Sequence, residues 1–248
     1  MLDKANVTLY RNYAQFVDAH TLQISEEKVT ADKILIAAGG IPERAAVPGI
    51  EHAIISDRMF TLLEQPKRFV VLGGGYIGVE FACILNALGS EVTQIIRRPY
   101  ILRGFDHDIR EHLQNSLIEQ GVKVWGNTTI KAIEQTKEGL KLTTTGDRAE
   151  TITADVVLAA TGRIPRLEKL GLEQTSVEVK NGAIAVNNYS CTTVPNIFAV
   201  GDCTDRINLT PVAIQEGRAF ADTEFGGKDR IMSHENVPSA VFTSPEAA

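Results

Sequence analysis

Residues 69–80 have the sequence FVVLGGGYIGVE, in which a short apolar run is followed by glycines spaced G-x-G-x-x-G. The apolar run predicts a buried strand, and residues 76–88 predict a helix after it. Between a strand and a helix, such glycines let the chain turn tightly and approach a pyrophosphate closely. We therefore predict a dinucleotide site at Gly73, Gly75 and Gly78, with the phosphates at the start of the helix. The alternative is a tight turn that binds nothing.

The residues after the next predicted strand, 91–96, indicate which dinucleotide is bound. A site for NAD places Asp or Glu about twenty residues after the glycines, where the carboxylate binds the ribose 2′-hydroxyl. This chain has Arg97 and Arg98 there, and Arg103 follows. A carboxylate would repel a 2′-phosphate, whereas a guanidinium pairs with it, so NADPH is predicted over NADH. The alternative is that these are solvated surface arginines, above all Arg98.

The rest of the chain alternates strands and helices in the manner of an α/β protein. The elements around the glycine motif form a β-α-β-α-β unit, which predicts a parallel sheet. Strands are predicted at 6–10, 13–17, 21–24, 34–38, 122–125, 156–160 and 197–200, a polar meander at 129–145, and helices at 57–64 (with Ser56 as its cap), 106–120 and 211–225.

A second motif, Gly201-Asp202, follows the apolar run at 197–200. Ligands of parallel sheets bind at the carboxyl edge of the strands, where this carboxylate is expected. Asp202 could accept hydrogen bonds from a sugar or ribityl hydroxyl there. A simple helix cap is the alternative for this residue.

Composition narrows the class of protein. The chain has 248 residues, 44 % of them apolar, with 25 Lys+Arg against 31 Asp+Glu and a net charge of −6. These values argue against disorder and against a nucleic-acid partner. No apolar stretch approaches the roughly 18 residues of a membrane helix, so no membrane association is expected. Only three cysteines are present, without C-x-x-C spacing, which favours free thiols in a reducing, cytoplasmic compartment. No metal site is predicted.

Eight motifs, in order, extend over nearly the whole chain. They are ILIAAGG (34–40), VPG (47–49), GGGYIGVE (73–80), LRGFD (102–106), ATGRIP (160–165), VGD (200–202), LTPVA (209–213) and VFTSPE (241–246). Together they resemble the motifs of the flavin-dependent, class I pyridine nucleotide–disulfide oxidoreductases, and within that family the glutathione reductases.

This resemblance implies an α/β fold with two Rossmann-like domains, three-layered and with antiparallel meanders, in which an NADPH domain is inserted in an incomplete FAD domain. Residues 1–40 would be the C-terminal part of the first FAD-domain segment, 41–164 the NADPH domain and 165–233 the second FAD-domain segment. Residues 234–248 would start a truncated dimerisation domain, so the chain is expected to be an internal fragment of an enzyme that forms homodimers.

The resemblance also implies roles for individual residues. Tyr76 matches the ring that covers the flavin until nicotinamide displaces it, and Glu80 matches the carboxylate that pairs with a lysine beside flavin N5; these two are the implied catalytic residues. The implied NADPH site comprises Gly73, Gly74, Gly75, Ile77, Gly78, Glu80, Arg97, Arg103, Gly162, Arg163 and Ala240. The implied FAD contacts are Ala14, Gly39, Asp202 and Thr210.

In the complete enzyme that the resemblance implies, NADPH reduces the flavin, the flavin reduces a cysteine pair, and a thiolate attacks glutathione disulfide. The family's first glycine motif, its two cysteines four residues apart and the lysine that pairs with Glu80 are absent from this sequence, and Cys83, Cys191 and Cys203 do not replace the pair. We therefore expect NADPH binding, weak or no FAD binding and no reduction of glutathione disulfide by this chain alone. The five histidines, at 20, 52, 107, 112 and 234, are interpreted as surface residues.

Two alternatives remain open at this point. Within the family, the chain resembles trypanothione reductase, mercuric reductase and dihydrolipoamide dehydrogenase, although the last would require an acidic residue in place of Arg97. In a different class, the chain would be an NADPH-binding module without disulfide chemistry.

Overall fold

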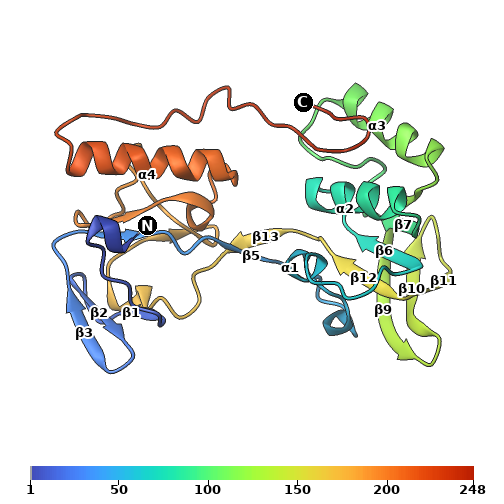
Figure 1. Cartoon of the computed structure of the whole chain (residues 1–248), viewed down its shortest axis with the longest axis horizontal. Helices are drawn as coiled ribbons and strands as arrows, with labels where there is room; N and C mark the ends of the chain where they lie inside the picture. The colour runs from blue at the N-terminus through green and yellow to red at the C-terminus, as the bar shows by residue number, and fades with distance from the viewer. Residues whose placement is uncertain (1) are drawn as a thin grey trace. The chain divides into compact units, whose positions relative to one another are not determined.

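The computed structural model describes residues 2–248, which divide into two compact units (Figure 1). Unit 1 comprises the residues up to Ile41 together with Ile164–Asn236. Unit 2 comprises Pro42–Arg163 together with Val237–Ala248. Both units are therefore built from two separate segments of the chain.

Unit 2 contains a four-stranded parallel sheet in the order β12-β6-β7-β8. Its strands are β6 (Arg68–Leu72), β7 (Glu91–Ile95), β8 (Lys123–Trp125) and β12 (Val156–Ala159), and its two long helices are α2 (Tyr76–Ala87) and α3 (His107–Glu119). Asp106 caps α3 by accepting a hydrogen bond from the N–H of Asp108 at 2.9 Å. These elements match the predicted β-α-β-α-β unit.

Two apolar clusters make unit 2 three-layered. Alternate residues of β6 point to opposite faces, as in any strand. Phe69 and Val71 pack with α2 and α3 on one face. Val70 and Leu72 pack on the other face against an antiparallel meander of β9 (Thr128–Thr136), β10 (Gly139–Gly146) and β11 (Thr151–Ala154). The predicted α/β class with antiparallel meanders is confirmed.

Unit 1 is built on a parallel pair of strands, β4 (Ile34–Ile36) and β16 (Ile197–Ala199). An antiparallel sheet, β1 (Ala14–Phe16), β2 (Thr21–Ile24) and β3 (Glu27–Thr30), precedes β4. The remaining elements of this unit are η1 (Asp3–Ala5), η3 (Leu172–Gln174), the hairpin β14 (Val179–Lys180) and β15 (Ala183–Ile184), η4 (Gly201–Thr204) and α4 (Thr210–Glu224). Two short strands at the unit boundaries, β5 (Gly40–Pro42) and β13 (Arg163–Pro165), pair with each other.

Two predicted elements differ from the structure. Residues 6–10 form no strand, because their apolar side chains Val7 and Leu9 are half exposed and have no sheet face to cover. The predicted helix at 57–64 is only α1 (Ser56–Met59), preceded by η2 (Ile50–His52), and its cap is Ile55 rather than Ser56. Met59 is the one buried residue in α1, so no apolar face stabilises a longer helix.

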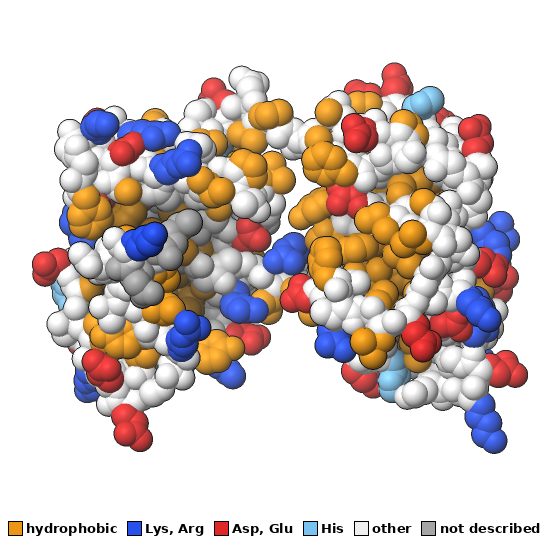
Figure 2. Space-filling view, in the orientation of Figure 1, with side chains coloured by type: hydrophobic (Ala, Val, Ile, Leu, Met, Phe, Trp, Pro, Cys, Tyr) orange, Lys and Arg blue, Asp and Glu red, His pale blue; other side chains and the backbone are white. Residues whose placement is uncertain are grey.

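An apolar stripe on unit 2 runs along α2 and continues onto the residue after α1. Phe81, Ile84 and Leu88 lie one turn apart, and the last two are 47 % and 63 % exposed. The ring of Phe60 contacts that of Phe81 with centroids 5.7 Å apart. Figure 2 shows hydrophobic side chains exposed over the part of unit 2 where Figure 1 places α1 and α2. No helix among residues 2–248 combines the length and hydropathy needed to cross a bilayer.

Candidate functional site

The glycine turn between β6 and α2 is shaped by contacts that exclude side chains. Gly73 has a φ of +121°, and a Cβ there would lie 2.2 Å from the carbonyl oxygen of Ala160. A Cβ on Gly78 would lie 2.8 Å from the carbonyl oxygen of Gly73, so the helix passes very close to the turn. A Cβ on Gly75, in contrast, would meet nothing within 4 Å. The two outer glycines serve packing, and the middle one leaves open space at the start of α2.

The helix α2 begins directly after this turn, at Tyr76. Gly75 is the N-cap residue and has no side chain with which to cap the helix. Tyr76 and Ile77 are the first two helical residues, and Tyr76 is 43 % exposed. The first N–H groups of a helix have no intrahelical acceptor and together carry a partial positive charge, which suits a phosphate.

The loop that contains the predicted arginines is attached to the glycine turn. The N–H of Leu102 donates to the carbonyl oxygen of Gly74 at 2.6 Å. A Cβ on Gly74 would lie 3.0 Å from Ile96 Cγ2, so this glycine packs directly against the end of β7. Arg97 follows Ile96, Arg103 follows Leu102, and both arginines are exposed. The fold thus brings two guanidinium groups to the loop that adjoins the turn.

Gly162 lies at the same edge of the sheet, just after β12. The N–H of Ala160 donates to the carbonyl oxygen of Leu72 at 2.9 Å, which aligns the ends of β12 and β6. A Cβ on Gly162 would lie 2.8 Å from Glu43 Oε2, and the N–H of Glu43 donates to the Gly162 carbonyl oxygen at 2.9 Å. Arg163 follows in β13 and is half-buried.

Glu80, on the second turn of α2, binds the backbone of the C-terminal segment. Its Oε1 accepts a hydrogen bond from the N–H of Phe242 at 3.0 Å. Ala240, two residues earlier, is exposed, whereas Val241 is buried in the core of unit 2. The sequence offered no signal for this partner of Glu80, because the two residues are far apart along the chain.

In unit 1 the ends of β4 and β16 bring the predicted residue Asp202 against Gly40, the neighbour of the predicted Gly39. A Cβ on Gly40 would lie 3.1 Å from Asp202 Oδ2, so the carboxylate lies against the glycine turn after β4. Gly39 has a φ of +71°, which glycine adopts without strain. Thr210 is the exposed first residue of α4, and Ala14 lies in a separate sheet, in β1.

A buried carboxylate near Asp202 was missed in the sequence. Glu216 on α4 is 1 % exposed, and its Oε2 accepts the N–H of Gly201 at 2.6 Å. Its Oε1 accepts from Arg206 at 2.8 Å and lies 2.7 Å from His234 Nε2. The interpretation of His234 as a surface residue is wrong, since it is half-buried against this carboxylate. Glu216 falls on the same helix face as the buried Val212, a pattern that could have revealed it.

The three cysteines are free. Burial raises the pKa of the Cys83, Cys191 and Cys203 thiols above the ordinary value. Thiolates are the reactive form, so these residues are weak nucleophiles at neutral pH.

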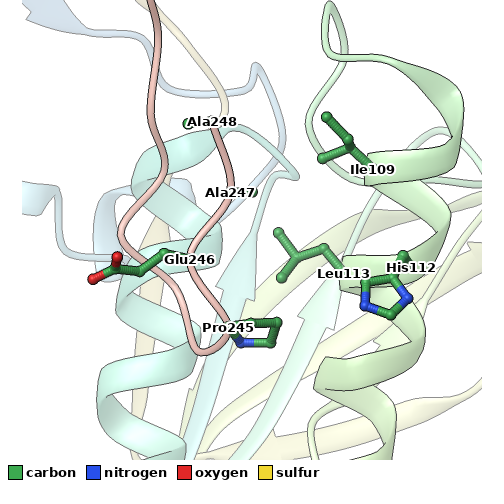
Figure 3. Close-up of a pocket in the computed structure, with 7 residues that line it drawn as sticks. All are labelled: Ile109, His112, Leu113, Pro245, Glu246, Ala247 and Ala248. Carbon is green, nitrogen blue, oxygen red and sulfur yellow. The ribbon is translucent and has the colours of Figure 1, made fainter.

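Figure 3 shows a pocket in unit 2 between α3 and the last four residues. Leu113 points from α3 toward the terminal segment, whereas the carboxylate of Glu246 points away from the helix (Figure 3). The lining comprises Ile109, His112, Leu113, Pro245, Glu246, Ala247 and Ala248, and it includes none of the predicted cofactor residues.

Comparison with known proteins identifies relatives over the whole chain. Glutathione reductase from Nostoc sp. is 50 % identical over 258 aligned residues, which cover 100 % of this chain and 56 % of the relative. Glutathione reductase from Burkholderia cepacia is 46 % identical and trypanothione reductase from Trypanosoma congolense 44 % identical, covering 100 % and 89 % of this chain. These alignments cover 55 % and 45 % of the two relatives, so the chain spans about half the length of the curated proteins it matches.

A solved structure shares the fold. The HOCl-induced flavoprotein disulfide reductase RclA from Escherichia coli superposes with a TM-score of 0.91 at 29 % identity, over 98 % of this chain and 57 % of that one. The family described as pyridine nucleotide-disulphide oxidoreductase matches residues 1–217. With the glycine turn, the parallel sheets and these relatives in agreement, the chain belongs to the pyridine nucleotide-disulphide oxidoreductase family.

Proposed function

We propose that unit 2 is an NADPH-binding domain. The observation that supports this most directly is the hydrogen bond between Leu102 and Gly74, which holds the loop of Arg97 and Arg103 against the glycine turn. A dinucleotide with its pyrophosphate at the start of α2 would reach this loop with its adenosine ribose. Two guanidinium groups there favour a 2′-phosphate over a bare hydroxyl.

The residues of unit 2 fit such a ligand. The open space at Gly75 is the place where a side chain would block a pyrophosphate, and Gly73 and Gly78 already exclude side chains for packing reasons. Gly162 lies at the neighbouring strand end, and Tyr76, at the start of the helix, would lie between the turn and solvent. Bound NADPH would supply a hydride to an acceptor. Glu80, held by the Phe242 N–H, would position the 240–242 segment at the nicotinamide end of the site.

We propose in addition that unit 1 supplies part of an FAD site. Asp202, against Gly40, would accept hydrogen bonds from the ribityl chain, and Gly39, Thr210 and Ala14 would contact other parts of the flavin nucleotide. The names of the relatives support a complete enzyme that is a disulfide reductase acting on glutathione disulfide. That the complete enzyme is a cytoplasmic homodimer is part of the same proposal. The three cysteines are free thiols and form no pair with one another, so the disulfide-reducing step would use cysteines other than these.

The test of the NADPH site is a titration of the purified chain with NADPH and with NADH. Each guanidinium–phosphate hydrogen bond contributes about 1.5–3 kcal/mol, so NADPH is expected to bind at least tenfold more tightly. Arg97→Ala and Arg103→Ala should each remove most of this difference while leaving the affinity for NADH unchanged. Arg148→Ala, which removes an exposed arginine from the meander, is the matched control. Equal affinities of the unmodified chain for the two nucleotides would refute the assignment.

A further inference from the structure

Gln94 is a fully buried amide in the parallel sheet of unit 2. It lies in β7 between the buried residues Thr93 and Ile95, and it is itself 0 % exposed. Its Nε2 donates a hydrogen bond to the carbonyl oxygen of Gly73 at 2.9 Å. The side chain therefore reaches from the middle of the sheet to the first glycine of the turn.

The orientation of this amide is fixed by its partner. A backbone carbonyl only accepts hydrogen bonds, so the NH2 group and not the oxygen of Gln94 must face Gly73. The other end, Oε1, is buried and has no hydrogen-bond partner among residues 2–248. A buried acceptor without a partner destabilises a protein by about 1–3 kcal/mol. An apolar side chain of the same length would remove this unpaired oxygen but would leave the Gly73 carbonyl without its donor, so the two effects oppose each other and stability alone does not explain the amide.

The hydrogen bond has an effect on the neighbouring N–H group. The carbonyl of Gly73 and the N–H of Gly74 belong to one peptide unit, and donation to the carbonyl polarises that N–H and makes it a stronger donor. The bond also restrains the rotation of this peptide. Gly73 has no Cβ to limit its own backbone angles, and its φ is +121°. The stronger N–H donor and the fixed peptide orientation both belong to the glycine turn that would bind the pyrophosphate.

We propose that Gln94 is a positioning residue for the pyrophosphate of the dinucleotide, acting through the Gly73–Gly74 peptide. This inference rests on the proposed NADPH site and adds a determinant that Arg97 and Arg103 do not provide. The arginines distinguish the 2′-phosphate from a hydroxyl, whereas Gln94 acts on the part that NADPH and NADH share. Replacing Gln94 must therefore lower the affinity for NADPH and for NADH by the same factor.

The experiment compares Gln94→Leu and Gln94→Met with the unmodified chain by calorimetric titration with NADPH and NADH. One neutral hydrogen bond corresponds to roughly a three- to tenfold change in affinity, and we expect that loss for both nucleotides in both variants. The urea midpoint of unfolding should change little, because the unpaired oxygen is removed while the Gly73 carbonyl loses its donor. Thr93→Val, at the neighbouring buried position of β7, is the matched control and should leave both affinities unchanged.

A second readout needs no nucleotide. The amide resonance of Gly74 in a 15N–1H spectrum should shift in Gln94→Leu, since the polarising bond is lost, while that of Gly182, in the β14–β15 hairpin of unit 1, stays in place. Unchanged affinities in well-folded variants, or a fall in stability with no change in affinity, overturn the role of Gln94 and leave the NADPH site intact. Failure of the unmodified chain to bind either nucleotide overturns both.

Discussion

The substitution Glu216→Gln tests how much the buried carboxylate that binds the turn after β16 contributes to the stability of unit 1. The carboxylate accepts three hydrogen bonds: Oε2 from Gly201, and Oε1 from Arg206 and His234. A glutamine has one accepting oxygen, so its NH2 group must face either the N–H of Gly201 or the guanidinium of Arg206. In both orientations a donor meets a donor.

The size of the effect follows from burial. Removing one partner of a buried ion pair destabilises a protein by about 3–5 kcal/mol. The side chains of Arg206 and His234 are 21 % and 25 % exposed, so water can partly replace the carboxylate and the lower end applies. We expect a loss of about 3 kcal/mol, which corresponds to about 10 °C in the unfolding midpoint of a unit of this size.

The single tryptophan makes the assay selective. Trp125 lies in β8 of unit 2, and Glu216 lies in unit 1. Thermal unfolding is followed by calorimetry and circular dichroism for both units and by tryptophan fluorescence for unit 2 alone. The Glu216→Gln variant should lower the transition of unit 1 and shift the fluorescence transition much less.

The control is Glu178→Gln, in the same unit, where an exposed carboxylate pairs with Lys180 at 3.1 Å. Exposed pairs contribute little, so this change should alter stability by less than about 1 kcal/mol. An unchanged midpoint in Glu216→Gln, or a shift confined to the fluorescence of Trp125, would refute the reasoning.

Three further predictions concern single residues. Hydrogen bonds from Arg68 lower the pKa of Asp155, so this group stabilises unit 2 above the ordinary pKa of aspartate and the contribution is lost as the pH falls through the lowered pKa. In the unmodified chain the urea midpoint of unit 2, measured by tryptophan fluorescence, should fall as the pH is lowered from about 5 to 2, and in Asp155→Asn this fall should be smaller. The same pH profile in both proteins would contradict this prediction. Gly75→Ala should change stability by less than about 1 kcal/mol yet reduce NADPH affinity at least tenfold, because the new side chain would occupy the open space at the turn. Gly73→Ala should instead destabilise unit 2 by about 3 kcal/mol or more, since its Cβ would clash with a carbonyl oxygen at 2.2 Å. Titration with NADPH and urea unfolding of both variants measure this contrast, and the reverse pattern of effects would contradict the roles given to the two glycines. Cys203, buried and with a raised pKa, should react with a thiol reagent only on unfolding, as mass spectrometry of the labelled chain would show; fast labelling of the folded chain would disprove its burial.

The elements that the sequence predicted well are those with a strong local signal. Apolar runs followed by glycine identified β4, β6 and β12, because a buried parallel strand has the same composition in every context. The short α1 and the missing strand at 6–10 were mispredicted, because local propensity was not supported by a face to pack against.

The contacts within the candidate site were less predictable. The motif placed Gly73, Gly75 and Gly78 at a strand–helix turn, and the structure places them there. Two buried polar side chains, Gln94 and Glu216, hold the turns through partners on other elements of the fold. Their partners are fixed by tertiary packing, which one sequence does not display.

The construction of each unit from two chain segments has a consequence for the order of folding. The parallel partner of β4 begins 163 residues later, from Ile34 to Ile197. Closing a flexible loop of that length would oppose folding by about 4.5 kcal/mol. Unit 2 removes much of this penalty once it has folded, because the hydrogen bond between Glu43 and Gly162 brings the two ends of its longer segment together. Folding of unit 2 thus brings together the two chain segments that form unit 1. A destabilising substitution in the core of unit 2 is therefore expected to slow the pairing of β4 with β16 in unit 1, although unit 2 contributes no strand to that sheet.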